Sequence, residues 1–213
     1  MTKLAIISGG MDSITMLYEY REDISHVLNF VYGSKHNSRE THWAEYHAAQ
    51  LGKAFYRVPL DFISTLYKSD LLETGGAIPE GHYADESMKK TVVPFRNGVM
   101  LAIAAGLAES VGCNGIAIAN HFGDHTIYPD CRASFIDPMS KAILEGTWNR
   151  IELFAPYTTL SKRDIGLRGR DFNVPYDKTY TCYNGGVEHC GRCGSCTERK
   201  EALDGFDPTT YAV

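Results

Sequence analysis

Residues 3–17 read KLAIISGGMDSITML, and this stretch decides the fold. The apolar run Lys3–Ile7 predicts a short buried strand, and the apolar positions that follow Met11 recur with helical spacing. A strand that turns at once into a helix directs the unpaired N–H groups of the first helical turn toward one point, where they can bind an anion. The alternative is a tight turn that binds no ligand. The stretch alone leaves both interpretations open.

The composition of the turn suits phosphate at all but one position. Gly9 and Gly10 allow the backbone to approach an anion without a clash from a Cβ atom, and Ser8 and Ser13 add hydroxyl donors. Asp12 would repel phosphate, so we expect it to cap the helix or to hold a Mg²⁺ ion that bridges phosphate oxygens. The predicted phosphate-binding loop consists of Ser8, Gly9, Gly10, Met11, Asp12 and Ser13.

Strand-like apolar runs alternate with helical patterns along the rest of the chain. Further strands are expected at 26–32, 54–59, 115–119 and 151–154, and helices at about 40–51, 99–111, 133–145 and 162–172. This alternation predicts an α/β fold with a doubly wound, mostly parallel sheet. We expect residues 1–175 to form one α/β domain, with a polar excursion at about 67–92, and residues 176–213 to pack on it.

Ligands in such folds bind beyond the carboxyl ends of the strands. Four polar segments fall at predicted strand ends, at 8–13, 32–39, 120–132 and 156–162. The loop at 8–13 is one of them, so its place in the fold favours phosphate binding over an empty turn.

The composition excludes several classes of protein. The chain has 213 residues, a formal net charge of −5 and no apolar run that approaches the roughly 20 residues of a membrane span. The acidic balance argues against a nucleic-acid backbone as the main partner, which requires clustered lysine and arginine. No signal peptide is visible, because Asp12 interrupts the first apolar run too early. We therefore expect a cytoplasmic protein with no membrane partner.

Four cysteines are bunched near the C-terminal end of the sequence, at Cys182, Cys190, Cys193 and Cys196. In a reducing cytoplasm such bunching indicates a metal site in preference to disulfides. Structural zinc takes four thiolate or imidazole ligands, and four ligands leave no open position for water. The spacing therefore predicts structural Zn²⁺, with an iron–sulfur cluster as the chemical alternative.

Several segments together resemble one family. The Ser-Gly-Gly-x-Asp-Ser loop is similar to the pyrophosphatase loop of ATP-dependent adenylating ligases, which have an adenine nucleotide alpha hydrolase-like, Rossmann-like fold. The runs CYNGGVEHCGRCGSCTERKEAL (182–203), HFGDHTIYPDCRASF (121–135), VPFRN (93–97) and YGSKH (32–36) resemble segments of the 7-cyano-7-deazaguanine synthase family. Phe95 stands where that family usually has glycine, and Ser34 and Lys35 replace its glutamine and arginine. The resemblance extends from residue 4 to about residue 203.

The resemblance implies an activity in queuosine or deazaguanine-modified nucleic acid biosynthesis. The family converts 7-carboxy-7-deazaguanine and ammonia to the nitrile, using ATP and Mg²⁺, through adenylated intermediates. The loop would hold pyrophosphate and Asp12 would hold Mg²⁺. Lys162 would reach the α-phosphate or pyrophosphate, and Arg96, beside Asn97, would engage a carboxylate or phosphate.

The resemblance also implies a pocket for the deazaguanine ring. One edge of that ring presents N–H donors that a carboxylate can accept as a forked pair, and Asp124 and Asp130 are the candidates. Arg132 would contact the carboxylate of the substrate. Members of the family are commonly homodimers, so we expect a homodimer that binds small molecules and no nucleic acid directly.

The sequence alone leaves three alternatives open. One is a related adenylating enzyme that stops at the amide or uses another acceptor, and a second is an RNA-thiolating ligase that shares the loop. The third is a zinc-stabilised nucleotide-binding module without enzyme activity. An RNA-thiolating enzyme would be expected to have a basic face and catalytic cysteines at the pocket, whereas this chain is acidic.

Overall fold

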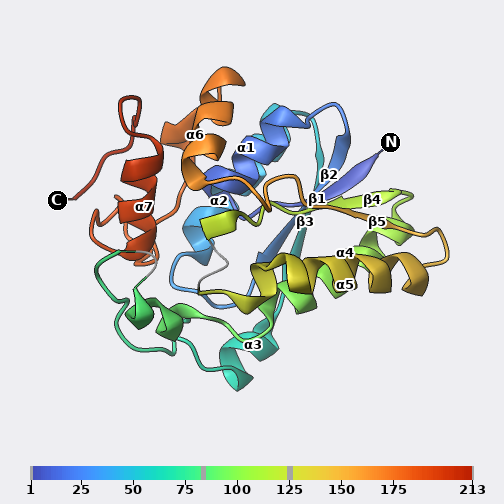
Figure 1. Cartoon of the computed structure of the whole chain (residues 1–213), viewed down its shortest axis with the longest axis horizontal. Helices are drawn as coiled ribbons and strands as arrows, with labels where there is room; N and C mark the ends of the chain where they lie inside the picture. The colour runs from blue at the N-terminus through green and yellow to red at the C-terminus, as the bar shows by residue number, and fades with distance from the viewer. Residues whose placement is uncertain (1, 83–84, 124–126, 213) are drawn as a thin grey trace.

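Five parallel strands form a single sheet at the centre of the molecule (Figure 1). The computed structural model describes residues 2–82, 85–123 and 127–212. The strands are β1 (Lys3–Ile6), β2 (Ile24–Val31), β3 (Ala54–Pro59), β4 (Gly115–Ala117) and β5 (Glu152–Phe154), and their order is β3-β2-β1-β4-β5. The predicted α/β fold with a parallel sheet is confirmed, and the predicted strand ends differ from these by at most two residues.

Helices cover both faces of the sheet. They are α1 (Met11–Glu19), α2 (Asn37–Gln50), α3 (Asp61–Leu66), α4 (Arg96–Ser110), α5 (Ala133–Gly146), α6 (Lys162–Asp171) and α7 (Gly194–Ala202). Short 3-10 turns occupy Glu86–Thr91, Pro129–Cys131 and Tyr176–Lys178. Helices α1, α2 and α6 lie on one face, and α4 and α5 lie on the other (Figure 1). The fold is therefore doubly wound, as predicted.

Two apolar cores result from the alternation of side chains along the strands. Neighbouring residues of β1 are fully buried on opposite faces, with Leu4 in the core under α4 and α5, and Ala5 in the core under α1, α2 and α6. Successive side chains of a strand point to opposite sides, so a strand covered on both faces is apolar throughout. This explains why Lys3–Ile7 reads as a continuous apolar run.

The strand order reverses at β1, and this reversal places the ligand site. The chain runs outward from β1 through β2 to β3, then returns to the other side of β1 as β4 and β5. The connections that leave the carboxyl ends of β1 and β4 therefore run in opposite directions and open a crevice between them. The segments 7–10 and 118–120 form the beginning of that crevice.

Helix α4 begins at Arg96, three residues before its predicted start. The preceding residue, Phe95, has a left-handed backbone with φ of 53°. One oxygen of Asp130 accepts the backbone N–H of Asn97 at 2.8 Å, so the first turn receives its cap from a distant segment. A local sequence pattern does not reveal such a cap.

The polar segment after β3 is held against the sheet by Lys35. Its ammonium group donates to the carbonyl oxygens of Asp70 at 2.5 Å, Leu72 at 2.8 Å and Gly76 at 2.7 Å. All three N–H donors are used, so Lys35 anchors the predicted excursion and has no donor left for a ligand.

The C-terminal segment packs beside α6 and ends on the surface (Figure 1). Arg199 of α7 is completely buried and fixes this segment through four hydrogen bonds. The guanidinium donates to the hydroxyls of Thr179, Thr181 and Thr209 and to the carbonyl of Tyr176 at 2.7–2.9 Å.

Among the described residues, none of the helices has the length and apolar character that a membrane span requires.

Candidate functional site

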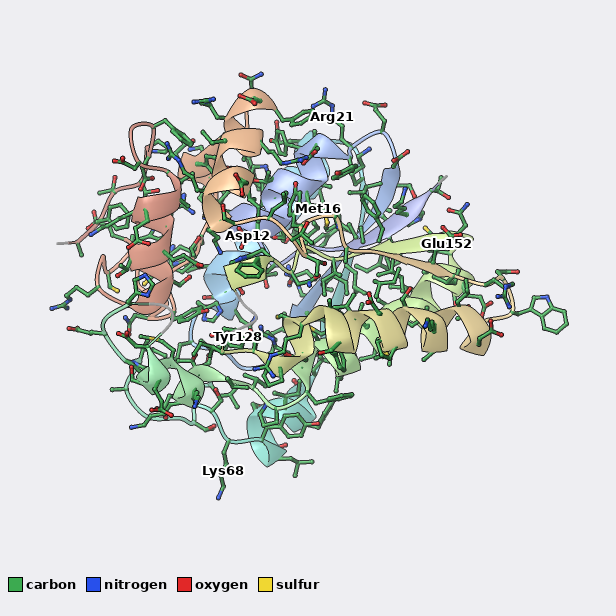
Figure 2. All side chains as sticks on the ribbon, viewed as in Figure 1. Asp12, Met16, Arg21, Lys68, Tyr128 and Glu152 are labelled. Carbon is green, nitrogen blue, oxygen red and sulfur yellow. The ribbon has the colours of Figure 1, made fainter. Side chains whose placement is uncertain are left out.

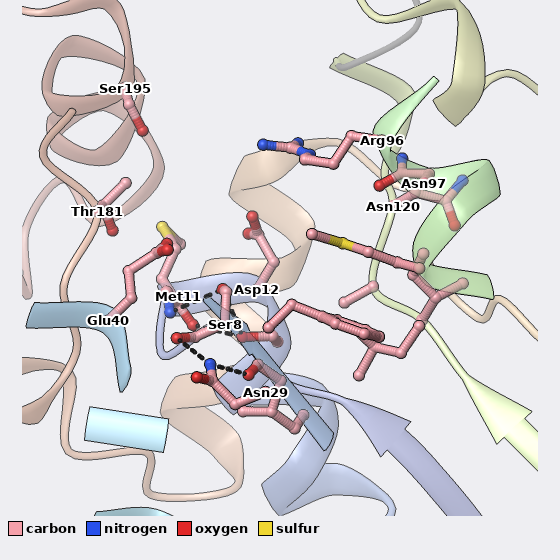
Figure 3. A pocket seen from close by; sticks show the side chains of 18 of the residues that line it. Ser8, Met11, Asp12, Asn29, Glu40, Arg96, Asn97, Asn120, Thr181 and Ser195 are labelled. Carbon is pink, nitrogen blue, oxygen red and sulfur yellow. Dashed lines mark hydrogen bonds between the residues drawn. The ribbon is translucent and has the colours of Figure 1, made fainter. Parts of the chain in front are cut away.

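A cavity opens at the crevice between β1 and β4, and eight of the predicted site residues line it (Figure 3). These residues are Ser8, Gly10, Met11, Asp12, Ser13, Arg96, Asn97 and Lys162. They come from α1, α4, α6 and the β1–α1 loop, so the fold joins segments more than 150 residues apart. Asp12 lies toward the middle of the molecule in Figure 2, whereas Lys68 projects from the outer edge.

The β1–α1 loop has a conformation that only glycine allows at its second position. Gly9 has φ of +108°, and a Cβ atom there would lie 2.1 Å from the carbonyl oxygen of Glu40. The Ser8 hydroxyl accepts the Gly10 N–H at 3.1 Å and lies 3.1 Å from the Ser13 hydroxyl. The loop therefore gathers two hydroxyls and the N–H groups at the start of α1 around one point, as an anion site requires.

Asn29 of β2 anchors this loop from below. Its side-chain amide donates to the carbonyls of Ile7 at 2.9 Å and Ser8 at 3.3 Å, as the dashed lines of Figure 3 show. The Thr41 hydroxyl of α2 donates to the other end of the same amide at 2.8 Å. A rigid loop costs less conformational entropy when it binds a ligand.

Lys162 stands among two carboxylates and an imidazole at the far side of the loop. Its ammonium donates to Asp12 Oδ2 at 2.5 Å and lies 3.2 Å from Glu198 Oε2 and 3.3 Å from His121 Nε2. Asp12 Oδ1 is buried and has no hydrogen-bond partner in the described part of the chain. A carboxylate oxygen in that state suits a cation, so the residues fit the predicted Mg²⁺.

The start of α6 fixes the position of Lys162. Ser161 and Asp164 form a reciprocal capping box, in which the Ser161 hydroxyl accepts the Asp164 N–H at 3.1 Å and the Asp164 carboxylate accepts the Ser161 N–H at 3.0 Å. Lys162 is therefore the first residue of the helix, and its side chain extends across the crevice to Asp12.

Glu198 is a site residue that the sequence analysis missed. It lies on α7, two residues after Cys196, and packs within 3.9 Å of His121 as well as beside Lys162. Its position in the cysteine-rich segment does not indicate a role at the cavity, because its contact with Lys162 depends on how α7 packs against α6.

Arg96 lies half-buried on the opposite wall of the cavity. Its guanidinium donates to the Tyr32 hydroxyl at 3.0 Å and lies 5.6 Å from the centre of that ring. Burial acts against the charge, but Tyr32 and Asp130 outweigh it, so the pKa of Arg96 is raised. The guanidinium is a permanent positive charge that faces the cavity.

Three other predicted substrate contacts are not among the described residues that line the cavity. Asp130 caps α4 through Asn97 and does not line the cavity. Arg132 is exposed and also lies outside the lining. Asp124 falls outside the described residues.

His36 and Glu40 also line the cavity, His36 fully buried and Glu40 with 13% of its side chain exposed, and the sequence analysis assigned neither a catalytic or binding role. His36 Nε2 and Glu40 Oε2 lie 3.4 Å apart, one helical turn apart at the start of α2. Burial raises the pKa of Glu40 to about 8, although Arg96 and the Ser8 hydroxyl act in the opposite direction. Burial also lowers the pKa of His36 to about 3. The signal that could have found this pair is the i, i+4 spacing just beyond a predicted strand end.

The four predicted metal ligands converge in a separate cluster. The Sγ atoms of Cys182, Cys190, Cys193 and Cys196 all lie within 4.8 Å of one another, and none of these residues forms a disulfide. Backbone N–H groups point at the sulfurs, from Cys190 to Cys182 Sγ and from Cys193 to Cys190 Sγ, each at 3.3 Å. Four thiols with such donors fit a tetrahedral metal ion such as zinc.

The cysteine cluster and the cavity share one segment of chain. Thr181 and Tyr183 flank Cys182, Ser195 precedes Cys196, and all three side chains line the cavity. The metal site therefore lies directly behind one wall of the candidate nucleotide site.

The family model described as "Queuosine biosynthesis protein QueC" matches residues 2–207. The chain is 57% identical over 211 residues to the 7-cyano-7-deazaguanine synthase of Porphyromonas gingivalis, covering 98% of this chain and 96% of that protein. It is 45% identical over 215 residues to the 7-cyano-7-deazaguanine synthase of Desulfotalea psychrophila, covering 99% and 98%. The solved structure of NMN synthetase from Francisella tularensis has a TM-score of 0.54 and 10% identity, covers 97% of this chain and 78% of that chain, and is similar in fold alone.

Proposed function

The chain belongs to the queuosine biosynthesis protein QueC family, and we propose that it converts 7-carboxy-7-deazaguanine and ammonia to 7-cyano-7-deazaguanine with ATP. The observation that carries the proposal is the likeness to enzymes of that name over nearly the whole chain. The cavity supports it, because the loop, Lys162 and Arg96 converge on one space.

The reaction requires activation of a poor electrophile. The negative charge of a carboxylate repels nucleophiles, and oxide is a very poor leaving group. Attack of the carboxylate on the α-phosphorus of ATP gives an acyl adenylate and pyrophosphate, and ammonia then displaces AMP to give the amide. A second ATP adenylates the amide oxygen, and loss of AMP leaves the nitrile. The enzyme contributes position and charge stabilisation in both adenylations.

The loop and α6 are suited to the phosphate chemistry. The hydroxyls of Ser8 and Ser13 and the N–H groups at the start of α1 would hold the pyrophosphate. Asp12 would hold Mg²⁺, which when bound neutralises phosphate charge. Lys162 would then exchange its contact with Asp12 for one with the departing pyrophosphate or the α-phosphate.

The opposite wall is suited to the acid substrate. Arg96 is a half-buried cation that faces the cavity, and a guanidinium can bind a carboxylate through two parallel hydrogen bonds. The cap on α4 uses an oxygen of Asp130, so we propose Asp124 ahead of Asp130 as the group that accepts from the deazaguanine ring. We also propose Asn97 and Arg132 as substrate contacts.

We assign a structural role to the cysteine cluster. A tetrahedral Zn²⁺ bound by four thiolates has no open position for water or substrate. The ion would fix the segment that supplies Thr181, Tyr183 and Ser195 to the cavity. We further propose that the enzyme acts as a homodimer in the cytoplasm.

Product analysis tests the proposed function. The purified protein is incubated with 7-carboxy-7-deazaguanine, ATP, Mg²⁺ and ammonium, and the products are identified by mass spectrometry. We expect the nitrile together with two AMP and two pyrophosphate for each nitrile formed. Accumulation of the amide alone would contradict the nitrile assignment, and no turnover at all would contradict the substrate.

A further inference from the structure

Both nitrogen steps of the proposed reaction need a base. Ammonium is the main form of ammonia at neutral pH, and it has no lone pair for attack until it loses a proton. The adenylated amide must also lose N–H protons before the carbon–nitrogen triple bond can form. The adenylation of a carboxylate needs no base, because the attacking oxygen carries no proton. A base is therefore required in some steps and not in others.

The described lining of the cavity offers one carboxyl group that is not paired with a lysine or an arginine. Among those lining residues, Asp12 and Glu40 are the two acidic side chains, and Asp12 is bonded to Lys162. No lysine or arginine lies within 4 Å of the Glu40 carboxylate in the described part of the chain. His36 lines the same wall, but burial keeps its imidazole neutral and weakly basic.

The fold presses Glu40 against the phosphate-binding loop. Its carbonyl oxygen occupies the space that a Cβ atom on Gly9 would need, and its Oε1 lies 3.9 Å from the ideal Cβ position on Gly10. Its side chain is 13% exposed and faces the cavity, as Figure 3 shows. His36 Nε2 lies 3.4 Å from Oε2 of this carboxylate. Glu40 thus borders both the point where pyrophosphate would leave and the space that Arg96 faces.

We propose that Glu40 is the general base that takes a proton from ammonium and later from the nitrogen of the adenylated amide. This inference rests on the proposed function, because it assigns a role within that reaction. A carboxylate without a lysine or arginine partner can pair with a small cation such as ammonium. His36 acts as a positioning residue that holds the carboxylate toward the cavity.

The first half of the reaction moves two protons away from nitrogen. NH₄⁺ gives one proton to the Glu40 carboxylate, and the resulting NH₃ forms a bond to the carbonyl carbon as the bond from that carbon to the AMP oxygen breaks. The nitrogen then loses a second proton to the departing phosphate, which leaves the neutral amide. Glu40 returns its proton to water before the second half begins.

In the second half, the amide oxygen attacks the α-phosphorus of another ATP and pyrophosphate leaves. The adenylated species carries two N–H protons on a cationic nitrogen. Its first proton is acidic enough to pass to water. Glu40 takes the second proton as the bond from carbon to the AMP oxygen breaks and the triple bond forms.

The electrostatic setting supports a base that works near neutral pH. The groups that face Glu40 are His36 on its own helix, Arg96 of α4 and the Ser8 hydroxyl, while Asp12 of α1 and Lys162 of α6 line the same cavity. Burial raises the pKa of Glu40 to about 8. General bases are most efficient when their pKa lies close to the working pH.

The test compares half-reactions in the wild type, Glu40→Gln and Glu40→Asp. Exchange of labelled pyrophosphate into ATP, with the acid substrate and no ammonium, measures the first adenylation alone. Conversion of 7-amido-7-deazaguanine to the nitrile with ATP measures the second half without any ammonia. Glu45→Gln is the matched control, because Glu45 lies exposed on the same helix.

We expect Glu40→Gln to retain pyrophosphate exchange and to lose nitrile formation from the amide by about 10²-fold or more. The wild type should form nitrile from the amide faster as pH rises toward about 8, and Glu40→Gln should lose that pH dependence. Glu40→Asp should recover part of the rate and the pH dependence, and Glu45→Gln should match the wild type.

The outcomes separate this inference from the proposed function. If the wild type makes no nitrile, the proposed function fails whatever Glu40 does. If the wild type makes nitrile and Glu40→Gln makes it equally fast, the base assignment fails alone. Equal loss of pyrophosphate exchange and nitrile formation in Glu40→Gln would place Glu40 in the ATP site and would also overturn the assignment.

Discussion

Asp12 is the residue whose replacement separates the nucleotide site from the metal site. One of its oxygens accepts from Lys162 and the other is buried without a partner among the described residues, and Asp12 is not one of the four residues of the cysteine cluster. We expect Asp12→Ala to lower AMP release by about 10²-fold or more, because charge at the phosphates is no longer neutralised. Zinc content should be unchanged.

Chromatography of the nucleotides and atomic emission of the metal check the Asp12 prediction. Asp137→Ala is the control, since Asp137 lies exposed on α5. Loss of zinc in Asp12→Ala, with the control intact, would show that the two sites depend on each other.

The left-handed backbone of Phe95 lowers the free energy of unfolding, and two substitutions can measure by how much. Its backbone is left-handed, with φ of 53°, and the residue is 58% exposed, with its ring edge-on to that of Phe135 at 5.5 Å between ring centres. Left-handed backbone costs a residue with a Cβ roughly 1–2 kcal/mol, and glycine avoids that cost. Phe95→Ala and Phe95→Gly both remove the ring, but only glycine removes the strain.

We therefore expect Phe95→Gly to have a free energy of unfolding about 1 kcal/mol greater than that of Phe95→Ala. Urea denaturation of the two variants measures the difference. Equal stability, or a more stable alanine variant, would mean that the turn before Arg96 is not strained.

At the residue scale, the sequence predicted those site residues whose hydrogen-bond partners lie close to them in the chain. Ser8, Gly10 and Ser13 bond one another within six positions, so their pattern alone indicates a loop. Asp130 bonds Asn97 across 33 positions, and only the folded structure shows that its carboxylate is used as a helix cap. Glu198 was missed for the same reason, because its neighbours come from α6 and from the segment after β4.

At the scale of elements, α7 connects the metal site with the nucleotide site. Cys193 is its N-terminal flanking residue, Cys196 lies in its first turn, and Glu198 reaches Lys162 from its middle. We expect Cys193→Ser to lose zinc and also to lower pyrophosphate exchange, because α7 no longer holds Glu198 beside Lys162. Cys113→Ser, a buried cysteine outside the cluster, should keep both properties.

Metal analysis and the exchange assay on the same preparation check the Cys193 prediction. A variant that loses zinc but exchanges pyrophosphate at the wild-type rate would contradict the link through α7. Unchanged zinc would instead exclude Cys193 as a ligand.

The elements themselves differ in how far the sequence predicted them. The strands and the longer helices follow apolar periodicity, which records burial on one or both faces of the sheet. Helix α3 has one turn and a half, too short for a period to emerge, and α7 reads GSCTERKEA, which is almost wholly polar. Tertiary contacts such as those of buried Arg199 hold α7 in place, and periodicity does not encode them.

At the scale of the whole molecule, the cavity depends on residues from both ends of the chain. The loop at 8–13 supplies one wall, and Thr181, Tyr183 and Ser195 supply another. The cavity also brings together groups whose pKa values are shifted by burial. The free energy of unfolding should therefore depend on pH. Glu40 allows that dependence to be isolated.

The pKa of Glu40 is about 8 in the folded chain, above the ordinary value of 4.5. The folded state therefore holds this proton more tightly, and the stabilisation is complete below about pH 4.5 and is lost as pH rises toward 8. His36 and His189, whose pKa values fall to about 3 and about 4 on burial, change stability in the opposite direction only below about pH 6.5. Between pH 6.5 and 8 the wild type should lose about 1.5 kcal/mol of unfolding free energy that Glu40→Gln retains. Urea denaturation of both proteins at pH 6.5 and pH 8 measures this, and parallel losses in the two would contradict a raised pKa at Glu40.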